Sequence, residues 1–248
     1  MRGRLEREVQ QPLDGTSAII AAAAHELKTP LTLLAHIADT LADEQLALND
    51  AERGQYVHRL QLVSKRTLRL VQQLTLSYRL EDNRQLAFAF ELGPVNVREV
   101  CETALHELAP YAREYRQELQ FTAGSRPQLV VANREILYDV VVNLVDNAIR
   151  HNEPGMPVEL SAAAHADSLR LNVHDSGTAI TKQDLDRLRL TLGREPQPLS
   201  GHAGTSGLGL YIANQLAVAM GGSLGLGRAR QGTTFFVDLL RSRQLSLW

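Results

Sequence analysis

Two short segments of the 248-residue sequence carry side chains that could take part in phosphate chemistry. The first is His-Glu-Leu-Lys-Thr-Pro at 25–30, in which an imidazole stands beside a carboxylate. The second is Asn-Leu-Val-Asp-Asn-Ala-Ile-Arg at 143–150, in which two side-chain amides are four residues apart. An imidazole can act as a nucleophile, and amide oxygens can bind a metal ion that carries nucleotide phosphates. The sequence therefore predicts a nucleophile and a metal-nucleotide site in one chain.

His25 differs from the other histidines by its neighbours on a predicted helix. Glu26 can accept the proton on Nδ1, which leaves the Nε2 lone pair free to attack. Thr29 lies one turn later and could position a water molecule, and Pro30 is expected to bend the helix. A zinc protease motif would need a second histidine at position 29, so the sequence excludes that site. A bundle helix with a chance histidine-glutamate pair is the structural alternative.

Asn143, Asn147 and Arg150 share one face of a predicted helix because they are spaced by four and three residues. Amide oxygens can complete a Mg²⁺ shell, and a guanidinium can neutralise phosphate charge. The alternative is two polar residues on an exposed helix face. The residues around the two asparagines, at 140–142, 144, 145, 148 and 149, are all apolar, so polar side chains at this place need partners.

Two glycine-containing segments follow. Asp175 stands at the end of a predicted strand, before Ser176-Gly177, where its carboxylate could accept a hydrogen bond from an adenine amine. Residues 204–210 read Gly-Thr-Ser-Gly-Leu-Gly-Leu and lead into a helix predicted over 211–220. Backbone N–H groups in such a segment can approach phosphate. It matches neither a P-loop nor a dinucleotide-binding fingerprint.

Apolar residues at alternating steps of four and three predict two helices of roughly 30 residues that form an antiparallel hairpin. Leu68 and Val71 lie beside the second stripe, so one hairpin cannot cover all of this apolar surface. Pairing two hairpins into a dimeric four-helix bundle would bury it, and a partner within the chain is the alternative. The stripes are Ile20, Ala24, Leu27, Leu31, Leu34, Ala38 and Leu41, then Tyr56, Leu60, Val63, Thr67, Leu70 and Leu74.

A second domain is predicted after a linker marked by Gly93-Pro94. Its alternating helices and strands predict an α/β sandwich with a largely antiparallel sheet, which makes the fold class α+β. Helices are expected at 97–116, 134–151, 211–220 and within 181–204, and strands at 118–122, 128–131, 158–163, 169–174, 223–226 and 233–239. The expected domains are an N-terminal helical extension 1–15, the hairpin 16–82, the linker 83–96, the sandwich 97–240 and a tail 241–248.

Composition bounds the function further. The 26 basic and 28 acidic side chains give a net charge of −2, which argues against a nucleic-acid or anionic-membrane surface. The single cysteine, Cys101, excludes an intramolecular disulfide and fits a reducing compartment. The longest apolar run, 18–24, is shorter than the roughly 20 residues that cross a bilayer. We expect a soluble cytoplasmic chain, or the cytoplasmic part of a membrane sensor whose helix continues into residues 1–11.

These segments, in this order, resemble the two-component sensor histidine kinases over nearly the full length of the chain. Residues 25–30 resemble the phosphoacceptor box of that family, and residues 143–152 its asparagine box. Residues 175–180 and 204–210 resemble its two glycine boxes, and Gly232-Thr233-Thr234-Phe235 is similar to the strand that ends its ATP-binding domain.

The resemblance implies a homodimer with a Bergerat-type ATP fold that phosphorylates His25 and passes the phosphate to an aspartate of a response regulator receiver domain. It implies Mg²⁺ at Asn147, ATP phosphate contacts from Asn143 and Arg150, adenine recognition by Asp175 and phosphatase assistance by Thr29. The other nucleotide-binding positions that it implies are His151, Gly177, Ala179, Gly204, Thr205, Ser206, Gly207, Leu208 and Gly209.

Asn143 helps to distinguish a histidine kinase from a stand-alone ATPase. Related ATPases of the gyrase and chaperone type have a glutamate base at this place, and asparagine cannot activate water in that way. ATP hydrolysis should therefore be slow, which disfavours a stand-alone ATPase and leaves the γ-phosphate for His25.

The chain also departs from the family pattern. Ala179 replaces a glycine, Arg150 a lysine and His151 an aromatic residue, and the lid segment 184–193 lacks its phenylalanine. Leu188, Leu190 or Leu192 would have to anchor the lid instead. A catalytically weak pseudokinase that acts as a dimeric binding scaffold, or a dedicated phosphatase, is the alternative to an active kinase.

Overall fold

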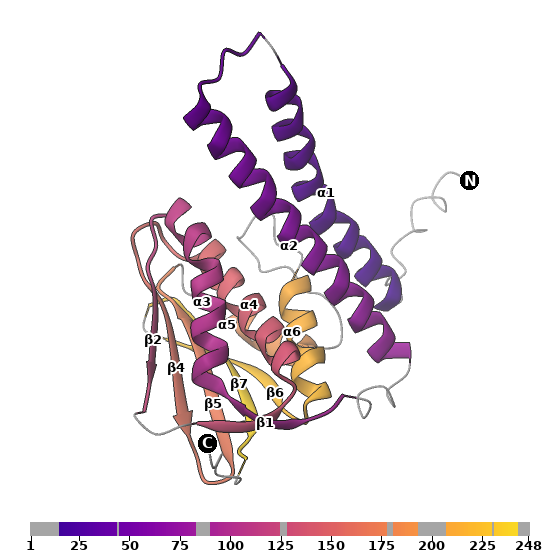
Figure 1. Ribbon diagram of the computed structural model, residues 1–248. Helices are drawn as coiled ribbons and strands as arrows, with labels where there is room; N and C mark the ends of the chain where they lie inside the picture. Colours follow the sequence, from indigo (N-terminus) through magenta and orange to yellow (C-terminus); the bar gives the residue numbers. More distant parts are fainter. Residues whose placement is uncertain are drawn as a thin grey trace, which may run out of the picture.

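The computed structural model shows a helical hairpin followed by an α/β domain (Figure 1). It describes residues 15–43, 45–82, 90–124, 128–177, 181–192, 207–229 and 231–242. This order of elements confirms the predicted α+β class. None of the described helices has the length and apolar character needed to cross a membrane.

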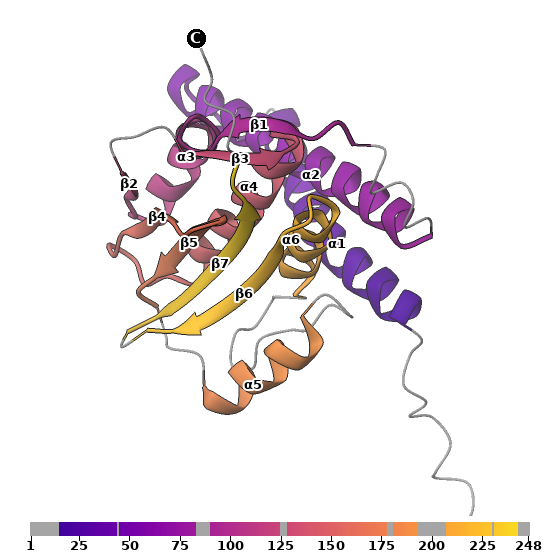
Figure 2. The ribbon, with the colours of Figure 1, turned by 90° about the horizontal axis from the view of Figure 1, so that it is seen from below.

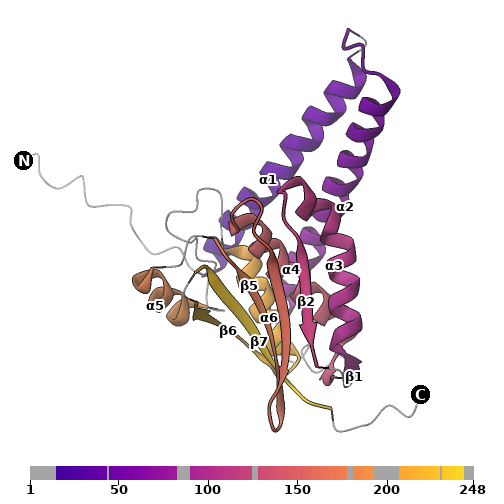
Figure 3. The ribbon, with the colours of Figure 1, turned by 90° about the vertical axis from the view of Figure 1, so that its left-hand side faces the viewer.

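The hairpin consists of α1 (Gly15–Ala42) and α2 (Asp50–Asp82). A capping box sets the start of α2: the Glu52 backbone N–H donates to Asn49 Oδ1 at 3.0 Å, and the Asn49 N–H donates to Glu52 Oε2 at 2.9 Å. Helix α1 continues through Pro30. Figures 1 and 3 show that the hairpin projects beyond the α/β domain at the end where α1 meets α2.

The two predicted stripes of the hairpin have different surroundings. All six side chains of the α2 stripe are partly buried. On α1, Ile20 and Leu31 are 64% and 53% exposed, whereas Ile37, which lies outside the predicted stripe, is buried. Helix α1 therefore has more apolar surface than α2 covers, because apolar residues occupy more than one of its faces.

One layer of the α/β domain is a five-stranded sheet. Its order is β2-β4-β5-β7-β6, with β2 and β4 parallel and the other neighbours antiparallel, which confirms the predicted, largely antiparallel sheet. The strands are β2 (Leu119–Ala123), β4 (Val158–Ala164), β5 (Ser168–Asp175), β6 (Ser223–Arg228) and β7 (Thr233–Leu240).

Three helices cover one face of this sheet, as Figures 1 and 2 show. They are α3 (Val97–Glu114), α4 (Arg134–His151) and α6 (Leu208–Ala219), with the short α5 (Lys182–Thr191) beside β6. Helix α4 lies between α3 and α6 and begins at a cap in which Asn133 Oδ1 accepts from the N–H groups of Glu135 and Ile136. Most of α4 is buried because it contacts helices on both sides and the sheet below.

A second, two-stranded sheet pairs β1 (Gly93–Asn96) with β3 (Leu129–Ala132). The sequence analysis placed residues 93–96 at the end of a linker, and the structure shows that they form a strand paired with β3. Val95 faces Val130 in the register of this pair, and both side chains are buried. Burial of these valines outweighs the breaking tendency of Pro94, which is tolerated in a strand that pairs on one edge.

Candidate nucleotide and phosphoacceptor site

Helix α1 presents the predicted phosphoacceptor segment to the α/β domain. His25 and Thr29 are exposed, and Glu26 between them is partly buried. Glu26 Oε2 lies 3.5 Å from Nη1 of Arg150 at the end of α4. The fold therefore brings the two predicted chemical segments together.

Helix α4 holds the two asparagines in a mostly apolar setting. Asn143 and Asn147 are partly buried, and the Nδ2 atom of each is buried without a hydrogen-bond partner among the described residues. Buried amides are normally satisfied, so this pair is typical of a ligand site. Their N–H groups suit phosphate oxygens and their carbonyl oxygens suit Mg²⁺, so the residues fit a metal-bound nucleotide.

The first glycine segment begins at the end of β5. Asp175 is only 2% exposed, and its Oδ1 accepts from the Gly177 N–H at 3.2 Å. A Cβ atom at Gly177 would lie 2.0 Å from the backbone oxygen of His151. Only glycine therefore permits this contact between the segment and the end of α4.

A second close approach joins the β6–β7 turn to the same place. Gly232 has φ +72°, and a Cβ atom there would lie 1.7 Å from the backbone oxygen of Asp175. Glycine is required on both grounds. The end of β5 is thus held between α4 and the Gly-Thr-Thr-Phe turn.

Asn152 is a positioning residue to which the sequence analysis gave no role. Its Nδ2 donates to the backbone oxygens of Met156 and Pro157 at 2.8 and 3.0 Å, and its Oδ1 accepts from the Ser176 N–H at 2.9 Å. It therefore links the loop after α4 to the first glycine segment. A polar residue directly after a buried helix was the available signal, but its partners could not be read from the sequence.

Arg150 belongs to a chain of charges that connects three helices, α1, α2 and α4. Its Nε lies 2.9 Å from Asp146 Oδ2, and Asp146 also accepts from Arg66 of α2. The Arg66 guanidinium stacks 3.7 Å above the ring of Tyr111 on α3. The Asp146 carboxylate raises the pKa of Arg150, and burial raises the pKa of Tyr111 to about 12. We call Glu26, Arg150, Asp146 and Arg66 the Arg150 network.

A second cluster fastens α2 to the α/β domain further along the helix. Arg69 Nη2 lies 2.5 Å from Glu107 Oε1 of α3, and Tyr138 of α4 donates to the same carboxylate. Burial opposes ionisation of Glu107, but the hydrogen bonds from Tyr138 and Arg69 outweigh it and lower its pKa.

The second glycine segment is only partly described. Gly207 adopts a left-handed conformation with φ +72° at the start of α6, followed by the buried Leu208 and by Gly209. The predicted positions Ala179, Gly204, Thr205 and Ser206 lie outside the described residues.

Leucines do anchor α5, as the missing phenylalanine led us to expect. Leu188 is buried in the core together with Leu185, which the sequence analysis did not single out. Leu190 is 71% exposed and has no such role.

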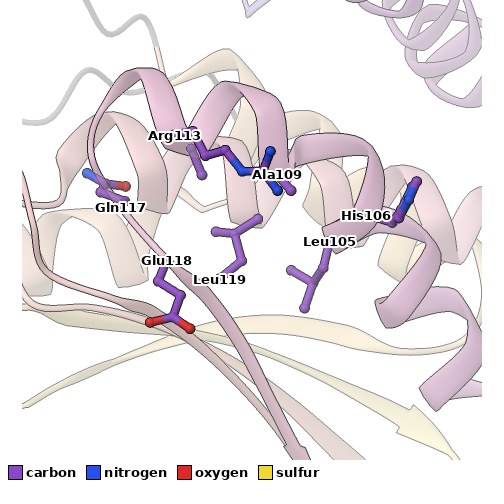
Figure 4. A pocket seen from close by; sticks show the side chains of 8 residues that line it. Leu105, His106, Ala109, Arg113, Gln117, Glu118 and Leu119 are labelled. Atoms are coloured by element: carbon purple, nitrogen blue, oxygen red, sulfur yellow. The ribbon is translucent and has the colours of Figure 1, made fainter.

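A separate hollow lies between α3 and β2 (Figure 4). Its volume is about 370 Å³, and its described lining includes none of the predicted site residues. The lining residues are Leu105, His106, Ala109, Ala112, Arg113, Gln117, Glu118 and Leu119. Most of its surface is apolar, and it does not contribute to the site described above.

Two family models match the two parts of the chain. Residues 16–83 match the His Kinase A (phospho-acceptor) domain, and residues 132–243 match the histidine kinase-, DNA gyrase B- and HSP90-like ATPase domain. The sensor histidine kinase AruS of Pseudomonas aeruginosa is 30% identical over 233 residues, which cover 90% of this chain. The chain spans 22% of the length of AruS.

Solved structures share the fold. The histidine kinase AdeS of Acinetobacter baumannii superposes with a TM-score of 0.59 at 20% identity, over 88% of this chain and 98% of AdeS. The histidine kinase ThkA, solved in complex with the response regulator protein TrrA, gives a TM-score of 0.56 at 18% identity, over 90% of this chain and 61% of ThkA. The phospho-acceptor model matches the hairpin and the ATPase model matches the α/β domain that follows it, and AruS is similar over both. The chain therefore belongs to the two-component sensor histidine kinase family.

Proposed function

We propose that this chain autophosphorylates on His25 with ATP and passes the phosphate to an aspartate of a response regulator. The observation that carries the proposal is the 3.5 Å contact between Glu26, which follows His25 in sequence, and Arg150, which ends the asparagine-bearing helix. The expected acceptor and the expected phosphate-binding face thus meet within one chain.

The residues have distinct roles in this reaction. Asn143 and Arg150 bind ATP phosphates, the Asp175 carboxylate accepts from the adenine amine, and Asn147 holds Mg²⁺. Mg²⁺ held by Asn147 would supply positive charge that offsets the charge of the phosphates, and the bond between the γ-phosphorus and the oxygen of ADP breaks as the new bond forms. The Nε2 atom of His25 forms the new bond to phosphorus, while Glu26 accepts the Nδ1 proton in a hydrogen bond. Asn143 cannot act as a base toward water, which limits wasteful hydrolysis.

The proposed kinase activity also implies two protein partners, a response regulator and a second copy of this chain. The solved complex of ThkA with TrrA supports a response regulator as the recipient of the phosphate. The exposed Leu68 and Val71 of the hairpin support a homodimer, because a second hairpin would bury them. Thr29, exposed one turn after His25, suits the positioning of water in a phosphatase reaction. A cytoplasmic location fits the use of ATP.

The test is incubation of the full chain with γ-labelled Mg-ATP, followed by acid and alkali treatment of the protein. Label that survives alkali and is lost in acid is expected, because phosphohistidine is acid-labile. His25→Gln should abolish it, whereas His36→Gln, a second exposed histidine on α1, should retain it. Full labelling of His25→Gln would refute the assignment.

The alternative function is a weak pseudokinase that serves as a dimeric scaffold or dedicated phosphatase. The observation that favours it is the departure of residues 179 and 184–193 from the family pattern. Retained ATP binding without any label on the wild-type chain would support this alternative over the kinase.

A further inference from the structure

The guanidinium of Arg150 is held by carboxylates from two different helices. Asp146, one turn earlier on α4, approaches its Nε at 2.9 Å, and Glu26 of α1 approaches its Nη1 at 3.5 Å. The side chains of Glu26 and Asp146 are only 17% and 20% exposed, so water screens these contacts incompletely. Arg150 is thus the link between the phosphoacceptor helix and the asparagine-bearing helix.

We propose that Glu26 and the phosphates of ATP compete for the guanidinium of Arg150, so that nucleotide binding releases Glu26 toward His25. This inference rests on the proposed function, which assigns Arg150 to phosphate and His25 to the acceptor role. It makes Glu26 a positioning residue whose partner depends on nucleotide.

The competition follows from the geometry of the guanidinium. Its N–H donors lie in one plane, and the edge that carries Nη1 faces Glu26 while Nε is taken by Asp146. A phosphate oxygen that binds Arg150 is left with Nη1 and Nη2, which are bonded to the same carbon atom, so the phosphate would lie next to the Glu26 carboxylate. The Glu26 carboxylate would then lie beside a polyanion, and the repulsion between like charges in a partly buried site would displace it.

Asp146 keeps Arg150 in place during this exchange. It is bonded to Arg150 on its own helix and to Arg66 of α2, and Arg66 is itself stacked on Tyr111. Arg150 therefore remains tethered through Nε when its Nη1 edge changes partner. Only the contact with α1 is exchanged.

The exchange would coordinate nucleotide binding with activation of the acceptor. While Glu26 is bound to Arg150, the guanidinium offsets the negative charge of the carboxylate and makes it a weaker acceptor for the imidazole N–H. Once displaced, the carboxylate can accept from Nδ1 of His25, the neighbouring residue, and hold the tautomer that attacks through Nε2. His25 would thus become a good nucleophile only when ATP is present.

The test measures affinity rather than phosphorylation. Titration calorimetry of the full chain with a non-hydrolysable ATP analogue and Mg²⁺ gives Kd for wild type, Glu26→Gln, Arg150→Met and the double variant. Glu26→Gln removes the carboxylate that competes with phosphate for Arg150. Because this ion pair is partly exposed, we expect Kd to fall about two- to fivefold. In the Arg150→Met background the same substitution should change nothing, because the two residues are coupled.

Glu107→Gln is the matched control, since it removes a different carboxylate that pairs with an arginine across the same domain contact. Its Kd should stay within about twofold of wild type. Equal tightening in Glu107→Gln would mean that loosening the contact is sufficient and would overturn the proposal. Tightening by Glu26→Gln that persists in the Arg150→Met background would overturn it as well. If the affinities are as expected but the wild-type chain takes up no label from ATP, the kinase activity is refuted and the competition for Arg150 still holds.

Discussion

At the scale of single residues, Asn143 and Asn147 present the clearest requirement for a ligand. Their amide nitrogens are buried without partners among the described residues, on a helix that is otherwise largely apolar. Burying an unsatisfied amide costs about 1–3 kcal/mol. A bound nucleotide would supply the missing hydrogen bonds and so remove this cost. Bound nucleotide should also stabilise the folded domain by mass action.

We predict that Asn147→Asp weakens Mg-ATP binding, with a rise in Kd of at least about tenfold, or about 1.4 kcal/mol. The substitution removes the amide N–H and adds a negative charge beside the phosphates. Asn172→Asp is the control, because the Asn172 amide bonds to Ser161 on the neighbouring strand. Calorimetry on both variants checks this, and unchanged affinity in Asn147→Asp would remove Asn147 from the site.

We predict that Gly177→Ala lowers the free energy of unfolding by about 1–3 kcal/mol, because its Cβ would lie 2.0 Å from the His151 backbone oxygen and force the segments apart. Nucleotide affinity should fall with it. Gly54→Ala on α2 is the opposite case: nothing lies within 4 Å of its Cβ, so we expect a gain of about 0.5–1 kcal/mol. Urea unfolding gives the free energy of unfolding of both variants. Equal values for Gly177→Ala and wild type would contradict the close contact.

At the scale of elements, α2 has two functions. Its apolar stripe is partly buried, and Leu70 and Leu74 of that stripe pack against the core of the α/β domain. Arg66 and Arg69 pair with residues of α4 and α3. Tyr138 and Glu107 complete the second of these contacts. The contacts are ionic and partly exposed, as is common between domains of one chain.

The Arg69–Glu107 contact should respond to acid. The folded chain lowers the pKa of Glu107, so its contribution to stability is present above the ordinary glutamate pKa of about 4.3 and is lost as pH falls through the lower folded value. Glu107→Gln should therefore cost up to about 1 kcal/mol at pH 7 and less at pH 3.

Urea unfolding at both pH values checks this expectation. Glu102→Gln, which removes a surface pair with Arg98 inside α3, should cost less at pH 7 because both side chains are more exposed. An equal loss in Glu107→Gln at both pH values would show that the ion pair is not what stabilises the contact.

At the scale of the whole molecule, the hairpin leaves large apolar side chains exposed on both of its helices. Ile20, Leu31, Leu68 and Val71 are between 43% and 64% exposed. Such a surface on two neighbouring helices is typical of an interface, and a second copy of the hairpin is the partner that we propose.

We predict that Leu68→Glu converts a dimer of this chain into a monomer, because a charge would be buried between hairpins. Sedimentation velocity measures the change. Leu190→Glu is the control, since Leu190 is 71% exposed on α5 of the α/β domain and should leave the dimer intact. A stable Leu68→Glu dimer would place the interface elsewhere.

Local pattern was sufficient for much of the architecture. Helix α4 begins and ends at the predicted residues, because Asn133 caps it and its apolar content demands burial. The positions of the five sheet strands along the chain, and the change from a helical hairpin to an α/β domain, were also predicted from periodicity, whereas the order of the strands within the sheet was not. Strand β1 was missed because it has four residues, one of them proline, and exists only through its pairing with β3.

The amino-acid sequence by itself determined which side chains are available: the histidine with its adjacent carboxylate, the paired amides and the glycines. Tertiary structure alone decided what they meet, because Glu26 and Arg66 come from the hairpin, whereas Asp146 and Arg150 come from α4, which is far from both hairpin helices in the chain. The same holds for Gly177 and Gly232, whose necessity follows from backbone oxygens of other segments. Spacing specifies a face of one helix, whereas a contact between helices depends on packing that no local pattern encodes.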